Sequence, residues 1–201
     1  MAKGDTRRFL RAFLTNPTSV GAIAPSSAHL ARRMVDGLNA PPGETVLEFG
    51  PGTGAFTGAL RDQLRSPESY LGIEINEAFV ELLRSRFADL TFVQGSAADA
   101  PAILDQHDRG RVRAIICGLP FASLPVAVQE GIVAALDTLI QEGAEFRAFQ
   151  YVHAYILPNA VRFRRRMNEL FGPVRRSRAV LGNLPPAYVL TWRRDPPSGK
   201  R

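Results

Sequence analysis

The sequence predicts an α/β fold with a seven-stranded, mostly parallel sheet and an antiparallel hairpin at its C-terminal end. Short apolar runs alternate with amphipathic segments of helical length, a pattern typical of a parallel sheet covered by helices on both faces. A glycine-rich turn directly follows the first apolar run. The last two apolar runs have no helix between them, which indicates a hairpin.

The expected elements follow one another in a regular order. We expect parallel strands at about 45–49, 70–74, 90–93, 112–117 and 146–152. Helices are expected at about 28–38, 55–64, 77–87, 101–104, 125–141 and 159–170. Gly143 and Gly172-Pro173 mark the ends of the last two helices. The hairpin strands are expected at about 174–181 and 187–193.

The chain divides into a main domain and two short flanking segments. Residues 1–40 are expected to form an N-terminal helical segment, residues 41–195 the main domain, and residues 196–201 a frayed tail. Within the first segment, residues 6–14 place phenylalanine and leucine at helical spacing, with arginines on other faces. Such a helix can lie in a membrane interface or close over the core as a lid.

Composition limits the class of protein and its partners. The net charge is +6. Eleven basic residues lie in the last forty positions, where the only acidic residues are Glu169 and Asp195. This distribution favours an anionic partner. The single cysteine, Cys117, excludes an internal disulfide and suits a reducing, cytoplasmic location. No apolar run has the length of a membrane span, so the chain is not expected to cross a membrane by itself. We also expect a cytoplasmic monomer that is peripheral at the inner face of the membrane.

The glycine-rich turn has the spacing Glu48-x-Gly50-x-Gly52-x-Gly54. A dinucleotide-binding turn would have a different glycine spacing, and the lysine of a phosphate-binding loop is absent. Glu74 ends the second strand, where an acid can accept hydrogen bonds from the two hydroxyls of a ribose. In an open parallel sheet these positions meet at the carboxyl edge, where ligands bind.

This combination resembles motif I of the Rossmann-like class I S-adenosylmethionine-dependent methyltransferases. The resemblance implies S-adenosylmethionine as cofactor and no metal. It implies that the turn holds the amino-acid part of the cofactor, that Glu74 holds the ribose, and that Ile75 or Asn76 lies beside the adenine. Ser96 stands where many members carry an acid for the adenine amino group. The cofactor-binding residues implied are Glu48, Gly50, Pro51, Gly52, Gly54, Glu74, Ile75, Ser96, Ala97 and Gly118.

The segment after the fourth strand bears on the methyl acceptor. Methyltransferases that act on base amines often carry a polar residue, two prolines and an aromatic residue here, whereas this chain has Gly118-Leu119-Pro120-Phe121. The missing polar residue argues against a base-reading site and against a nucleic-acid partner. Backbone carbonyls of Gly118 and Leu119 remain able to accept a hydrogen bond from an amine.

The same segment, the N-terminal stretch 13–27 and Asn183-Leu184-Pro185-Pro186-Ala187 resemble the bacterial phosphatidylethanolamine N-methyltransferases, which are related to the ribosomal RNA adenine dimethylases. The resemblance implies stepwise methylation of the phosphatidylethanolamine amine toward phosphatidylcholine, at an anionic phospholipid membrane surface. Two alternatives are an RNA adenine N-methyltransferase and a binding protein that uses the fold without catalysis.

Candidate residues for the reaction follow from this reading. His153, at the end of the fifth strand, is the candidate base, because its ordinary pKa suits removal of a proton from an amine. Water is the alternative acceptor. Tyr151 and Tyr155 are expected to share a face with His153 if the strand continues. The catalytic candidates are His153, Tyr151, Gly118 and Leu119, and the substrate-binding candidates are Phe13, Phe121, Tyr155, Tyr188, Arg164 and Arg178.

Overall fold

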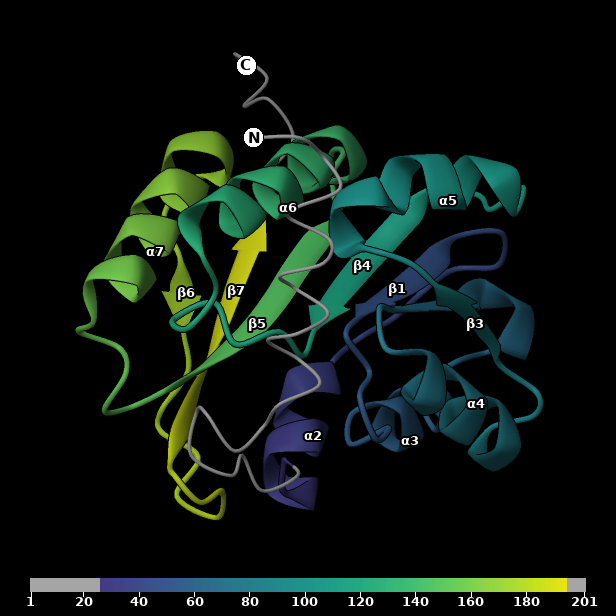
Figure 1. Ribbon diagram of the computed structural model, residues 1–201, viewed down its shortest axis with the longest axis horizontal. Coiled ribbons are helices and arrows are strands. Elements are labelled where there is room, and N and C mark those ends of the chain that lie inside the picture. The colour runs from purple at the N-terminus through teal and green to yellow at the C-terminus, as the bar shows by residue number, and fades with distance from the viewer. Residues whose placement is uncertain (1–25, 195–201) are drawn as a thin grey trace, which may run out of the picture.

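The computed structural model describes residues 26–194, which form one layered α/β body (Figure 1). Its centre is a seven-stranded sheet in the order β3-β2-β1-β4-β5-β7-β6. The first five strands in the chain run parallel, and the last two are antiparallel to their neighbours. The strands are β1 (Thr45–Phe49), β2 (Tyr70–Glu74), β3 (Thr91–Gln94), β4 (Val112–Cys117), β5 (Glu145–Tyr151), β6 (Arg175–Arg176) and β7 (Ala187–Arg193).

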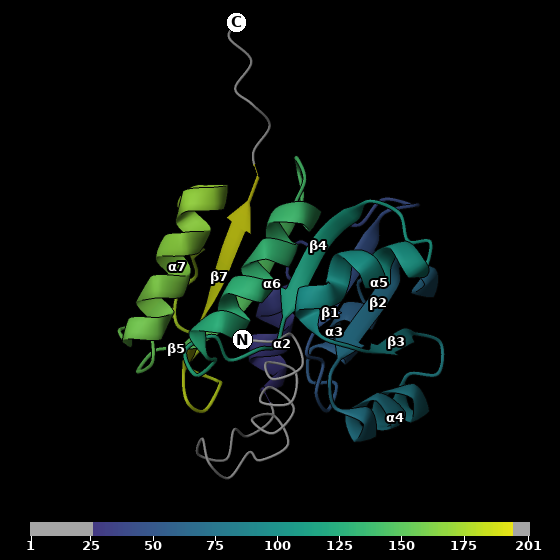
Figure 2. The ribbon, with the colours of Figure 1, turned by 45° about the horizontal axis from the view of Figure 1, so that its top comes forward.

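Helices cover both faces of the sheet (Figure 2). One face carries α5 (Ala100–Gln106), α6 (Val126–Leu139) and α7 (Pro158–Phe171). The other carries α2 (Ala28–Val35), α3 (Thr57–Arg61) and α4 (Glu77–Arg86). Two 3₁₀ turns, η2 (Pro67–Ser69) and η3 (Ala97–Asp99), lie before β2 and α5. Two hydrophobic cores result, one on each face, because the central strands are apolar on both sides.

The register brings the expected site residues to one edge. Phe49 pairs with Cys117, and Ile73 pairs with Phe49 on the other side. The chain therefore leaves β1, β2 and β4 at neighbouring points, so the segments after Phe49, Glu74 and Cys117 meet. This is the carboxyl edge at which parallel α/β sheets bind ligands.

The predicted fold is confirmed, and α2, α3 and β6 are clearly shorter than expected. The α3 helix has one short turn, whereas β5 has the expected length and is shifted by one residue, so that it ends at Tyr151. β6 has only two residues, because the Ser177 hydroxyl accepts the Val189 N–H and takes the place of a backbone carbonyl in the ladder. An isolated bridge between Val180 and Ala187 resumes the pairing.

The part of residues 1–40 that the structure describes belongs to the main body. Leu30 and Met34 of α2 are fully buried in the core on this face of the sheet. Arg147 of β5 donates to the carbonyls of Met34 (3.0 Å) and Asp36 (2.7 Å), which satisfies the end of α2. Residues of α2 therefore pack on the same core as the domain predicted over 41–195, and the boundary at residue 40 stays a prediction. The amphipathic stretch 6–14, Phe13 and the tail 196–201 lie outside the described residues.

Candidate functional site

The three glycines of the turn have three different physical roles. A Cβ on Gly50 would lie 2.4 Å from Cδ2 of Leu119, so this glycine permits the turn to approach the segment after β4. A Cβ on Gly54 would lie 2.7 Å from the ring of Phe87, so this glycine permits packing against the end of α4. Gly52 has a φ of +57° and open space at its Cβ position. Only Gly52 is therefore free of protein neighbours and able to receive a ligand close to its backbone.

Glu74 is fixed in position by the turn it faces. One carboxylate oxygen accepts the Gly52 N–H at 2.9 Å, and the other accepts the Asn76 N–H at 2.9 Å. Each oxygen keeps lone-pair capacity for a further donor, as two ribose hydroxyls require. Burial raises the pKa of Glu74, and the two backbone N–H donors lower it in part. The carboxylate is thus preorganised beside the open Gly52.

The segment after β4 comes into close contact with the glycine turn. The Gly118 N–H donates to the Phe49 carbonyl at 2.8 Å, and a Cβ on Gly118 would lie 2.5 Å from the Gly50 carbonyl oxygen. Only glycine fits at this crossing. Leu119 is buried against Gly50, and its carbonyl already accepts the Phe121 N–H at 3.0 Å.

The remaining predicted cofactor residues line the same edge. Ile75 follows Glu74 and is half-buried, and Pro51 is buried within the turn. The Ser96 hydroxyl accepts the Ala98 N–H at 3.2 Å, which leaves its proton available for donation. Ala97 is buried in the core. The individual cofactor contacts of these residues stay predictions.

These residues fit S-adenosylmethionine, because an open glycine backbone and an oriented carboxylate lie beside each other at the carboxyl edge. A family model described as a methyltransferase domain matches residues 46–143, which include the glycine turn, Glu74 and Gly118. Residues 46–143 therefore form an S-adenosylmethionine-dependent methyltransferase domain with the class I fold.

Relatives of this methyltransferase differ in their acceptors. An ornithine lipid N-methyltransferase from Singulisphaera acidiphila is 28% identical over 141 residues, which cover 69% of this chain and 73% of that protein. A ribosomal RNA small subunit methyltransferase A from Aromatoleum aromaticum is 31% identical over 93 residues, which cover 45% of this chain and 30% of that protein. The fold is similar to an S-adenosylmethionine-dependent methyltransferase from Anabaena variabilis, with a TM-score of 0.60, 14% identity and 94% coverage of each chain.

Behind the turn, the methyltransferase has a buried polar cluster that the sequence analysis did not predict. One Glu48 oxygen accepts from the Tyr70 hydroxyl (2.6 Å) and the Thr57 hydroxyl (2.8 Å). The other oxygen has no hydrogen-bond partner within residues 26–194, and Glu48 has no exposed surface. Burial raises the pKa of Glu48 to about 7, although both hydroxyls lower it. Glu48 thus supports the turn from below and does not face solvent.

We expect Glu48→Gln to remove a pH dependence of stability. The pKa of Glu48 is raised in the folded state from 4.5 to about 7. The stability that the protonated Glu48 carboxyl contributes is therefore complete below pH 4.5 and is lost as the pH rises through 7. The loss amounts to at most about 3 kcal/mol. Urea unfolding at pH 5 and pH 8.5 measures it. The exposed Glu81→Gln is the control, and an equal pH dependence in Glu48→Gln and wild type would contradict the assignment.

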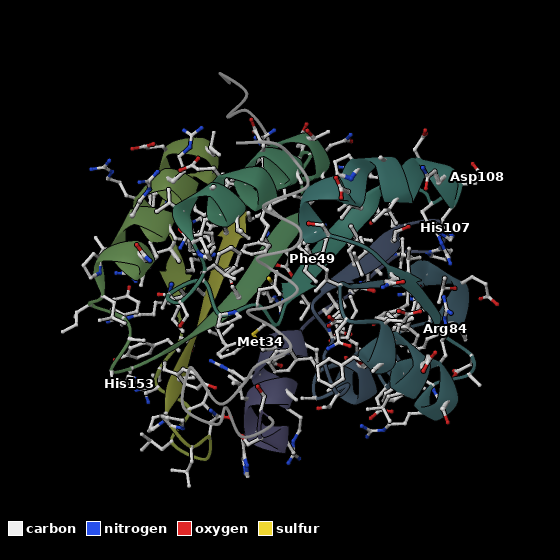
Figure 3. The ribbon with its side chains drawn as sticks, viewed as in Figure 1. Met34, Phe49, Arg84, His107, Asp108 and His153 are labelled. Atoms are coloured by element: carbon white, nitrogen blue, oxygen red, sulfur yellow. The ribbon has the colours of Figure 1, made fainter. Side chains whose placement is uncertain are left out.

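At the end of β5, aromatic rings lead from the turn toward His153. Phe56, next to α3, contacts Phe149 edge-on, Phe149 contacts Tyr151 edge-on, and Tyr151 stacks on His153 with centroids 5.7 Å apart. His153 is exposed, and Figure 3 shows it on the β6 and β7 side, with Phe49 nearer the centre. Burial raises the pKa of Tyr151, so its phenol stays protonated at neutral pH. The catalytic roles of Tyr151 and His153 stay predictions.

Tyr155 does not share a face with Tyr151 and His153, as a longer strand would require. The chain turns after Tyr151, with the Ala154 N–H donating to its carbonyl at 3.0 Å. Tyr155 instead contacts Tyr188 on the opposite face, and the Arg164 guanidinium lies 3.6 Å from its ring centroid. The Tyr155 ring, predicted to bind substrate, is therefore covered by the Arg164 guanidinium. Arg176 lies 4.7 Å from the Tyr188 centroid.

Phe121 requires a second correction. Its ring has no exposed surface and stacks on Phe163 with centroids 3.8 Å apart. Gln129 donates to the Phe121 carbonyl at 2.6 Å and holds the segment in this position. Phe121 is thus a core residue and offers no face to a substrate. Of the predicted substrate arginines, Arg164 also donates to Gln150 at 2.6 Å, and Arg178 is exposed.

Within residues 26–194, no cluster of metal-ligating side chains is present. In the same range, no helix combines the length and the apolar character that crossing a bilayer would need.

Proposed function

We propose that this methyltransferase N-methylates the primary amine of a membrane lipid, with phosphatidylethanolamine as the first candidate. The observation that carries the proposal is the position of Phe121. A base-methylating site needs an aromatic ring to stack on the base, and the ring after β4 is here part of the core. A small, flexible amine needs no such platform.

The lipid relative supports the same class of acceptor. Its match covers 69% of this chain and 73% of that protein, whereas the match to the ribosomal RNA relative covers 45% of this chain and 30% of that protein. Ornithine lipid is the second candidate acceptor, because it is the substrate in the name of that relative. Both candidate lipids present an amine at a membrane surface.

The chain's own residues account for binding and orientation in this proposal. S-adenosylmethionine supplies a methyl group on a sulfonium, and an amine must lose a proton before its lone pair can attack. Glu74 and Gly52 position the cofactor. Gly118 and Leu119 lie close against the glycine turn and so limit the space that is left for the methyl acceptor. His153 is the proposed proton acceptor, and loss of methyl transfer at pH 7 in His153→Gln tests this role.

One assay distinguishes the acceptors. The protein is incubated with methyl-labelled S-adenosylmethionine and one of four partners: phosphatidylglycerol vesicles alone, the same vesicles with phosphatidylethanolamine, the same vesicles with ornithine lipid, or total RNA. We expect label in the lipid phase only when an amine lipid is present. Label in RNA alone would refute a lipid acceptor. Label with ornithine lipid alone would replace the first candidate by the second.

A further inference from the structure

Exposed apolar side chains gather at one corner of the molecule. In the described part of the chain, six large hydrophobic side chains are exposed, and only Leu82 lies elsewhere, on α4. The other five, here named the apolar corner, are Ile156, Leu157, Val161, Leu181 and Leu184. Their exposed fractions reach 80% for Ile156 and 77% for Leu184. Soluble proteins rarely gather such side chains without a partner for them.

The apolar corner comes from two segments that are joined to each other. One runs from the end of β5 into α7, and the other connects β6 to β7. The Val152 N–H donates to the Pro186 carbonyl at 2.9 Å, and Tyr155 contacts Tyr188 across the two segments. Figures 1 and 2 both show these loops at the same corner, where β5 ends.

The β6–β7 loop is held in place, so its leucines are exposed in a defined conformation. Asn183 is buried, and its side-chain oxygen accepts the Ser27 N–H at 2.8 Å. Its amide donates to the Pro185 carbonyl at 2.7 Å. A buried asparagine thus fixes the loop to the start of α2 while Leu181 and Leu184 point outward at 74% and 77% exposure.

The charge around the apolar corner identifies its partner. Residues 152–168 and 173–187 contain seven arginines and no acidic residue. Three of these arginines, Arg162, Arg165 and Arg166, form exposed ion pairs with Glu130 or Glu169, and the other four form no ion pair with an acidic residue of the described chain. An anionic surface therefore complements both segments. The N-terminal residues 1–25 carry four basic residues and one acidic residue, and a second copy would present the same arginines, so both are electrostatically poor covers. Aliphatic side chains insert into lipid but do not stack on bases, which favours lipid over RNA.

We propose that the apolar corner, with its surrounding arginines, is the surface by which this methyltransferase docks on an anionic lipid membrane. The inference rests on the proposed lipid acceptor and adds the docking residues. Because β5 ends at the same edge of the sheet as β1 and β4, docking here turns the carboxyl edge toward the bilayer. A lipid amine then reaches the edge that carries Gly52 and Gly118 without leaving the membrane.

Vesicle cosedimentation tests the docking surface. The vesicles contain phosphatidylglycerol or phosphatidylcholine and no amine-methylation substrate, so docking is measured without the reaction. We expect wild type to bind phosphatidylglycerol vesicles and not phosphatidylcholine vesicles. The fourfold variant Ile156→Gln, Leu157→Gln, Leu181→Gln, Leu184→Gln should bind at least about tenfold more weakly. Leu82→Gln, which changes the exposed leucine outside the corner, should bind as wild type does.

Exposed positions tolerate polar side chains, so the variants should fold. Their affinity for S-adenosylmethionine, measured by calorimetry, verifies that they do. Equal vesicle binding by wild type and the fourfold variant would overturn the proposal. A wild type that binds no anionic vesicle would also overturn it. So would a fourfold variant that binds RNA more weakly than the wild type but binds vesicles equally well. If the docking loss occurs but no lipid is methylated, the surface is retained and the proposed acceptor fails.

Discussion

Glu74→Ala should weaken S-adenosylmethionine binding by more than about a hundredfold. The carboxylate offers acceptors for two ribose hydroxyls, and each hydrogen bond to a charged group contributes about 1.5–3 kcal/mol. Two such bonds correspond to about 3 kcal/mol or more, which is about two powers of ten in the dissociation constant. Titration calorimetry of the folded variant measures the change.

The control for this variant is Glu81→Ala, which removes an exposed carboxylate from α4, the helix that follows β2. It should leave the affinity unchanged. Burial raises the pKa of Glu74. As the pH is lowered, the affinity of the wild type for S-adenosylmethionine should therefore begin to fall at a higher pH than it would with a glutamate of ordinary pKa. The ionised carboxylate accepts both hydroxyls and protonation removes one acceptor, so acid weakens binding. Unchanged affinity in Glu74→Ala would show that the ribose lies elsewhere.

Much of the fold follows from local sequence. The apolar runs at β1, β2 and β4 are bounded by turn residues, and all three strands have the predicted limits. The hairpin prediction is confirmed in its direction but not in its length. Ser177 caused the difference, because its hydroxyl replaced a backbone acceptor. This exchange of one hydrogen-bond acceptor for another depends on the neighbouring strand, and residues 174–181 alone carry no signal for it.

The site was predictable in position and less so in the direction of its side chains. Spacing placed Glu74 and the glycines at the carboxyl edge, since strand ends meet there whatever their side chains. The motif after β4 placed Phe121 near the site but could not show that its ring turns to Phe163. Likewise, no local pattern connects Tyr70 with Glu48, which pair only because β1 and β2 are neighbours.

The different roles of the three glycines lead to a second large effect. Gly52→Ala should reduce S-adenosylmethionine affinity by about a hundredfold or more, while the protein still folds. No protein atom lies within 4 Å of a Cβ at this position, so the added methyl group clashes with nothing in the protein itself. The methyl group instead occupies the open space beside the Gly52 backbone, where we expect the cofactor to bind.

Gly37→Ala is a matched control for the backbone cost. Gly37 has a φ of +67° against +57° for Gly52, and it too has no atom within 4 Å of a Cβ, but it lies just after α2, outside the site. Both substitutions should lower the free energy of unfolding by about 1 kcal/mol, because an L-residue is disfavoured in this region. Only Gly52→Ala should lose cofactor affinity. An equal affinity of the two variants would mean that the cofactor does not approach the turn at Gly52, and the open glycine would then be a feature of the backbone alone.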